Sequence, residues 1–464
     1  MLLVFISFYL LATILVGIIS SRWIKSSEDY VLAGRKLPLI LASSALFATW
    51  FGSETVLGAS SEFVENGLLG VIEDPFGAAL CLVLVGVLVA RPLYRMKILT
   101  FCDFYRDRFS KRVELLSSLC MVPSYFGWIA AQLVAIGILF QVVAGIPTYM
   151  GIWIGTAVVL IYTYVGGLWA ISITDFIQTV VIVVGVLVLA IDLGNEAGGV
   201  GAVIAKTPEG FFRAIPEPTI EGTFHYLAAW ITIGLGSIPQ QDVFQRVMAA
   251  RSEKVAVRAS FVGAGMYLSV GFIPLFIGLC TVQVYPNLLA SVADAQLMLP
   301  TVVLQHAGIG LQILFFGALL SAIMSTTSGA MLAPATILAE NIIKPRVSGT
   351  RWQIQSDRQL LRVLRGSVIL VALASTIMAS MNTNIYDLVA LSSVLSLVSL
   401  FVPLMAGLYW KKATELGAIL AICLGMIGWL IFEYTETPMP SLLWGLGFSF
   451  LGQLLGDKVA LWQK

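Results

Sequence analysis

The sequence is poor in charged side chains, which make up 11% of its 464 residues. Soluble domains usually carry about 25% charged residues, so this low share argues against a soluble protein. Hydrophobic residues reach 58%, which is more than a soluble core can absorb. The composition therefore predicts a polytopic membrane protein embedded in a lipid bilayer. The net charge of +1 gives no indication of a nucleic-acid partner.

Cysteine and histidine are scarce as well, with five and two residues. Four cysteines are scattered through apolar segments and Cys102 lies in a basic loop, so we expect no disulfide and no metal motif. His225 and His306 are isolated, and we assign a proton role to neither. The GxSxG, HExxH and P-loop patterns are absent, and no catalytic set emerges. These absences argue against an enzyme.

Long apolar runs are what the sequence has instead. A transmembrane helix needs about 20 mainly apolar residues, and we find thirteen such runs. They lie near Leu2–Ser20, Leu37–Val64, Val71–Ala90, Leu116–Ala144, Tyr149–Gly166, Ala170–Leu193, Thr223–Met248, Val255–Val284, Ile309–Ala339, Gln359–Ser380, Ile385–Trp410, Gly417–Glu433 and Leu442–Leu461. The first run is too long for a signal peptide and lacks a small-residue cleavage site, so we interpret it as the first span.

The distribution of basic residues predicts the orientation. With the N-terminus outside, 25 of the 27 Lys and Arg residues, Lys464 among them, fall in cytoplasmic segments, and only Lys206 and Arg213 fall outside. This asymmetry favours thirteen spans in the plasma (cell or inner) membrane, with the C-terminus in the cytoplasm. The longest segments between spans, Gly194–Gly222 and Ile343–Arg358, are too short for a folded soluble domain.

Two of the runs are expected to break within the membrane. The second contains Thr49–Glu54, where Gly52 weakens the helix and Glu54 places a carboxylate in hydrocarbon. Such a carboxylate costs about 2.5–3.5 kcal/mol near the bilayer centre. The seventh contains Gly234–Asp242, in which Pro239 removes a backbone donor. Broken helices at matching positions of two halves are typical of inverted-repeat transporters, and their spacing is what suggests the repeat here.

The first break and the ninth run contain groups that suit a hard cation such as sodium. Backbone carbonyls from Ala48 to Phe51 lose their helical partners where the helix unwinds, and they become possible oxygen ligands. The hydroxyls of Ser325 and Thr326 could complete the shell of ligands. Small residues recur along Ala318–Gly329, however, and this pattern also favours close helix packing. A flexible kink is likewise the plainer interpretation of the first break, and both alternatives stay open.

Acidic and aromatic residues inside the runs have two interpretations each. Asp175 either caps a helix or pairs with an arginine of a loop, or it serves the inward exit path of a cation. Glu54 and Asp74 are placed to face an ion or solute route, although Asp74 could also lie at the outer membrane interface. Trp50 and Trp128 are either core residues or part of an aromatic site, in which rings near carboxylates hold an ammonium group.

Several motifs carry a resemblance to a known family. The most specific piece is Tyr162–Ala170, which continues into Thr174–Gln178, and the others are Leu32–Lys36, Gln241–Arg246 and the Ser325-Thr326 pair. With these motifs the chain resembles the sodium:solute symporter family from about Ser27 to Trp410. Within that family, Ala48-Thr49-Trp50 and Phe316-Gly317 look closest to the choline-transporter branch.

The resemblance implies a LeuT-like fold of five helices followed by five inverted helices, and transport driven by a sodium gradient. The implied segments are a peripheral first helix and loop (1–36), a first repeat (37–193), an extracellular loop (194–222), a second repeat (223–410) and two peripheral helices (411–464). The family's sodium ligands map to the carbonyls of Ala48, Phe51 and Ala322 and the hydroxyls of Ser325 and Thr326. Its acid after the Gly-Gly motif maps to Asp175.

The resemblance also implies residues that bind the solute. Trp50 and Trp128 match two aromatic residues of the choline branch, but Gln240 stands where that branch has a tryptophan. Glu54 and Asp74 stand where the choline branch has small residues and the sugar-transporting branch has acids. We therefore expect a small cationic or zwitterionic organic solute, such as a choline-like or betaine-like compound or an amino acid. A transporter-like sensor that signals through a partner protein is the alternative, and the sequence sets no oligomeric state.

Overall fold

The computed structural model describes residues 2–20, 22, 24–288, 292, 294–381, 384–435 and 437–462. Over these residues the chain is helical apart from its connections, and the one β-type contact is an isolated parallel bridge between Leu37 and Ala250. Lys464, one of the basic residues used to predict the orientation, lies outside the described residues. The predicted all-α membrane class agrees with this architecture.

The N-terminal half of the chain contains twelve helical elements up to α9 among the described residues, apart from one short 3-10 turn. They are α1 (Leu2–Ser20), α2 (Ser27–Leu32), α3 (Leu39–Trp50), the π-type turn η3 (Glu54–Gly58), α4 (Ala59–Gly70), η4 (Ile72–Gly77) with α5 (Ala78–Leu84), η5 (Val85–Val89) with α6 (Ala90–Met96), α7 (Phe101–Arg108), α8 (Lys111–Ala144) and α9 (Thr148–Glu196), with a short 3-10 turn at Ala33–Arg35 besides.

The C-terminal half follows a loop that carries the short helix α10 (Val200–Ala205). Its elements are α11 (Ile220–Gly236), α12 (Gln241–Ala249), α13 (Glu253–Val284), a 3-10 turn (Ala295–Leu297), α15 (Met298–His306), α16 (Ile309–Ile337), η7 (Leu338–Ile343), α17 (Lys344–Val347), α18 (Asp357–Met381), α19 (Ile385–Ser396), η8 (Leu397–Phe401), α20 (Val402–Tyr409), α21 (Glu415–Glu433) and α22 (Ser441–Trp462).

Each of the thirteen predicted runs coincides with one or more of these helices. Among the described residues, eight helices are long and apolar enough to cross a membrane, or nine if the bent pair α3 and η3–α4 counts as one span. The count of thirteen is therefore not confirmed. Gly167 divides α9 with φ 52° and ψ −162°, a conformation that favours glycine, so the fifth and sixth runs lie on one interrupted helix.

Both predicted breaks are present. The helix α3 ends at Trp50 and the chain resumes at Glu54 with a bend of 54°. The helix α11 ends at Gly236 and α12 begins at Gln241, so Pro239 lies in the gap between them. The two broken segments also meet at one end, because the amide of Leu37 donates to the carbonyl of Ala249 at 3.0 Å.

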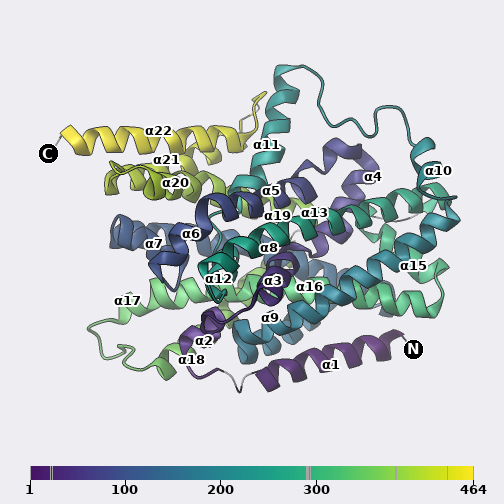
Figure 1. The fold of residues 1–464 in the computed structure, drawn as a ribbon, viewed down its shortest axis with the longest axis horizontal. Helices are drawn as coiled ribbons and strands as arrows, with labels where there is room; N and C mark the ends of the chain where they lie inside the picture. Colours follow the sequence, from purple (N-terminus) through teal and green to yellow (C-terminus); the bar gives the residue numbers. More distant parts are fainter. Residues whose placement is uncertain are drawn as a thin grey trace.

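The central helices lie between two flanking groups (Figure 1). The helix α1 runs along one edge of the molecule, while α21 and α22 pack together along the opposite edge. Between them lies α16, in which every residue from Phe315 to Ile337 is buried. A helix that is buried on all sides is expected to be apolar all round. Four consecutive hydroxyl residues, Ser325 to Ser328, therefore stand out in the middle of α16.

Candidate ion and solute site

The first break is held open by hydrogen bonds from outside its own helix. The Gly52 amide donates a hydrogen bond to the carbonyl of Trp50 at 2.9 Å, and a bond between residues only two positions apart makes a tighter turn than an α-helix. The next amide, that of Ser53, donates to the side-chain oxygen of Gln132 on α8 at 3.0 Å. A side chain from α8 thus replaces the missing helical acceptor, and the unwound conformation has its backbone donors paired.

Glycine at position 52 allows three polar side chains to approach the break. A Cβ atom at this position would lie 2.6 Å from Glu54 Oε2, 2.7 Å from Gln132 Oε1 and 2.8 Å from Thr326 Oγ1. These separations are shorter than ordinary contacts between a methyl group and oxygen. The break, α8 and α16 therefore meet at Gly52, and only a residue without a side chain fits there.

Two hydroxyls of α16 converge on the last turn of α3. Ser325 Oγ lies 3.0 Å from the carbonyl oxygen of Ala48, and Thr326 Oγ1 lies 3.2 Å from the same oxygen. Phe51 follows at the break, with its backbone outside the helical region (φ −78°, ψ 78°), and Ala322 lies one turn before the two hydroxyls. Oxygen atoms of this kind suit sodium, so the chemistry of the donors fits the predicted ion.

Asp175 is brought to the same place by α9. Its Oδ1 atom lies 2.5 Å from Ser325 Oγ, and its Oδ2 atom lies 4.0 Å from the guanidinium of Arg246 on α12. Both side chains are completely buried. The arginine also donates to the carbonyls of Ala45 and Asp242, at 3.3 and 3.2 Å. Asp175 therefore joins a hydroxyl of α16 to a buried cation, rather than capping a helix.

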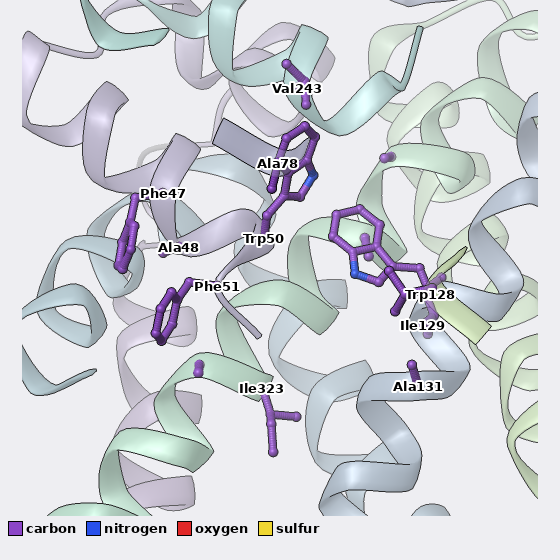
Figure 2. Close-up of a cluster of buried hydrophobic side chains, with 14 of the residues drawn as sticks. Phe47, Ala48, Trp50, Phe51, Ala78, Trp128, Ile129, Ala131, Val243 and Ile323 are labelled. Carbon is purple, nitrogen blue, oxygen red and sulfur yellow. The ribbon is translucent and has the colours of Figure 1, made fainter. Parts of the chain in front are cut away.

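A cavity adjoins the broken segment. All five residues predicted to bind solute line it. These are Trp50, Glu54, Asp74, Trp128 and Gln240, and they share the cavity with Ala78, Ile233, Ser237, Tyr267, Val389, Ser392 and Ser393. Figure 2 shows Trp50 and Trp128 on separate elements, with the rings of Phe47 and Phe51 on the opposite side of the broken segment from Trp50.

The two carboxylates of the cavity are held differently. Glu54 accepts hydrogen bonds from the indole of Trp128 at 3.1 Å and from the amide of Gln132 at 2.6 Å, so both of its oxygens are paired. Asp74 accepts a hydrogen bond from Thr55 to Oδ2 at 2.7 Å. Its other oxygen, Oδ1, is buried and has no hydrogen-bond partner among the residues that the structure describes. Asp74 is 1% exposed and does not lie at an open interface.

A network of hydrogen bonds connects the two breaks across the cavity. The indole of Trp50 donates to Asp242 Oδ2 on α12 at 3.0 Å, and Tyr125 on α8 donates to the other oxygen of Asp242 at 2.5 Å. The hydroxyl of Tyr267 donates to the carbonyl of Trp50 at 3.0 Å. The orientation of Trp50 at the first break is thus fixed by the helix that follows the second break.

Sequence reasoning missed several residues of this region. Gln132, Tyr267 and Arg246 are polar groups within apolar or membrane-embedded segments, and that contrast was the available signal. The serines of the wall, Ser237, Ser392 and Ser393, gave a weaker signal because serine is common in membrane helices. Their contribution becomes visible only when distant segments meet at the cavity.

The fold and the two adjoining polar sites are those of a multi-pass membrane transporter with broken helices. A sequence model of the sodium:solute symporter family matches residues 30–425. The chain belongs to the sodium:solute symporter family. The family consists of transporters rather than enzymes, and sodium-coupled symport is the activity that it supports here.

Individual relatives agree with this membership. The chain is 27% identical to a human high affinity choline transporter over 92% of this chain and 75% of that protein. It is 26% identical to a high-affinity proline transporter of Bacillus subtilis over 89% of this chain and 88% of that protein. A sodium-coupled sialic acid symporter, solved in a substrate-bound outward-open state, has a similar fold, with a TM-score of 0.85, 20% identity and coverage of 99% and 98% of the two chains.

Proposed function

We propose that this protein couples the inward movement of sodium to the uptake of a small cationic or zwitterionic organic solute by alternating access. One observation carries the proposal: the broken segment after α3 faces two polar sites at once. Ala48 lies against the hydroxyls of Ser325 and Thr326, while Trp50 and Glu54 line the cavity. An ion bound on one side would steady the backbone that forms the wall of the other.

Sodium would be bound by the carbonyl oxygens of Ala48, Phe51 and Ala322 and the hydroxyls of Ser325 and Thr326. In the structure the two hydroxyls lie next to the Ala48 carbonyl, so they turn from that carbonyl to the ion when it binds. Asp175 would receive sodium on its way to the cytoplasm, because it lies within 2.5 Å of Ser325 on the same side of α16. Low sodium in the cytoplasm then favours release.

The solute would occupy the cavity lined by Trp50, Glu54, Asp74, Trp128 and Gln240. Two acids and two indole rings favour a ligand with a positive charge. Relatives are named for the transport of choline and of proline, which are a cation and a zwitterion respectively. Choline-like and betaine-like compounds and amino acids are therefore the first solutes to test.

The membrane topology that goes with this function has thirteen spans in the cell membrane, with the N-terminus outside and the C-terminus in the cytoplasm. The second to sixth spans (37–193) form one repeat, and the seventh to eleventh (223–410) form its inverted copy. The segments 1–36 and 411–464 are peripheral, and 194–222 is an external loop. The matching positions of the breaks after Trp50 and after Gly236 support this division.

Uptake into proteoliposomes tests the proposal directly. A panel of choline, betaines, amino acids, sugars, monocarboxylates and small amines is offered with an inward sodium gradient and with potassium in its place. We expect at least one solute to accumulate only with the sodium gradient. Accumulation that is the same in potassium would refute sodium coupling, and saturable binding with no flux would favour a sensor.

A further inference from the structure

One residue that lines the cavity has a buried carboxylate oxygen without a hydrogen-bond partner among the described residues. Asp74 is 1% exposed and lines the cavity, and its Oδ1 atom has no hydrogen-bond partner in the part of the chain that the structure describes. A buried acceptor without a partner is unfavourable, because the hydrogen bond it made to water in the unfolded chain is not replaced. In a residue that lines a cavity, such an atom points to a ligand that donates a hydrogen bond to it.

The charge of the cavity points to the same ligand. Glu54 and Asp74 both line it, and none of the described residues around it is Lys, Arg or His. Arg246, the one buried base among the described residues, is engaged elsewhere, with Asp175 and the carbonyls of Ala45 and Asp242. A ligand with a carboxylate would therefore meet two acids and no basic side chain, whereas a ligand with one positive charge would be stabilised.

The aromatic part of the wall is incomplete for a quaternary ammonium group. Such groups are held by a cage of several ring faces, but here the rings of Trp50, Trp128 and Tyr267 share the wall with Ser237, Gln240 and the serines 392 and 393. Both indole N–H groups are already used, on Asp242 and Glu54. The remaining wall is rich in hydroxyl and amide groups, which suits a hydroxyl on the ligand.

We infer that the solute of this cavity is a small protonated amine that keeps at least one N–H group, carries a hydroxyl and has no carboxylate, with Asp74 Oδ1 accepting from the ammonium. Asp74 is then the residue that determines specificity. Glu54, which lies beside Gly52 and Thr326 on the ion side, faces both the amine and the proposed sodium. The inference rests on the proposed function of this cavity as the solute site, and it narrows the solute class to N–H cations.

A series of methylated ethanolamines tests the N–H requirement. Ethanolamine, N-methylethanolamine, N,N-dimethylethanolamine and choline share one skeleton and one positive charge, but the last has no N–H group. L-serine adds a carboxylate to the same skeleton. Binding to the purified full-length protein is measured in sodium by the fluorescence of its tryptophans, two of which line the cavity, and by calorimetry. Neither measurement depends on transport.

We expect dimethylethanolamine to bind at least about tenfold more tightly than choline, because choline leaves Asp74 Oδ1 without its charge-assisted hydrogen bond. Ethanolamine should bind more tightly than L-serine by a similar factor. The variant Asp74→Asn should weaken the binding of the three N–H amines. Their affinities should then be close to the affinity for choline. Glu65→Gln, which removes an exposed acid outside the cavity, is the matched control and should bind as the wild type does.

The inference is overturned if choline binds as tightly as dimethylethanolamine, if L-serine binds as tightly as ethanolamine, or if no amine of the series binds. If Asp74→Asn fails to fold, the order of ligand affinities measured on the wild-type protein still tests the inference. Failure of the proposed function gives a different result, because the amines would then bind in the expected order but show no sodium-driven accumulation in proteoliposomes.

Discussion

Removing the hydroxyl of Thr326 is the most direct perturbation of the proposed sodium site. In the structure Thr326 Oγ1 lies 3.2 Å from the carbonyl of Ala48 and makes no other hydrogen bond among those found for it. Thr326→Ala removes one of the two side-chain ligands and leaves the backbone ligands in place. An interaction of a hydroxyl with a charged partner contributes about 1.5–3 kcal/mol. Sodium affinity should therefore fall about 10- to 150-fold.

The neighbouring threonine provides the control for this variant. Thr327 is equally buried, but its hydroxyl bonds to the carbonyl of Ile323 in its own helix. Thr327→Ala should leave the sodium dependence of uptake unchanged, and Thr326→Ser should restore most of the affinity because it keeps the hydroxyl. The assay is the sodium concentration at half-maximal uptake in proteoliposomes. An unchanged half-maximal concentration in Thr326→Ala would refute the assignment of this site.

Three further predictions concern the break, the buried ion pair and the topology. Gly52→Ala should abolish uptake with little loss of yield, because the new methyl group lies 2.6–2.8 Å from three polar side-chain atoms at the site. Arg246→Gln should lower the free energy of unfolding by about 3–5 kcal/mol by leaving Asp175 buried without its partner, and adding Asp175→Asn should recover part of this loss. A cysteine at Lys206, in the loop 194–222, should react with an impermeant reagent added outside intact cells.

Each of these three predictions can be refuted independently of the others. Normal uptake by Gly52→Ala would show that the contacts around the break are not needed for transport. Equal thermal stability of Arg246→Gln and the double variant, measured in detergent, would show that the pair with Asp175 contributes no coupling. Labelling at position 206 only after permeabilisation would contradict the proposed orientation and indicate that the loop lies inside the cell.

The sequence predicted the helices well because their signal is local. A long apolar run predicts a helix regardless of the residues around it. The first run, Leu2–Ser20, has the same two ends as α1. Breaks were predicted for the same reason, since Gly52 and Pro239 act on the backbone next to them. The number of spans was harder to confirm, because the stretch before Gly167, Thr148–Ile161, is a shorter apolar helix, and α11, which ends at the second break, has only 17 residues.

The site could be predicted only as far as its residues differ from their neighbours. Glu54 and Asp74 were conspicuous as acids in apolar segments, and the structure places both at one cavity. The partners that fix them were not predictable in this way. Gln132 bonds to Glu54 from 78 positions away, and Asp242 bonds to Trp50 from 192 positions away. No local pattern encodes which distant helices pack together, so these contacts required the fold.

The unequal number of buried acids and bases around the two sites has an electrical consequence. Glu54, Asp74, Asp175 and Asp242 are buried there, and Arg246 is the one buried base among the described residues. With their carboxyl groups ionised, the empty protein has a formal charge of −3 in this region, and one sodium ion with one monovalent amine reduces its magnitude by two. Each elementary charge that crosses 100 mV changes the free energy by about 2.3 kcal/mol. An inside-negative potential would then favour return of the empty site to the outside, so the membrane voltage itself would accelerate the cycle.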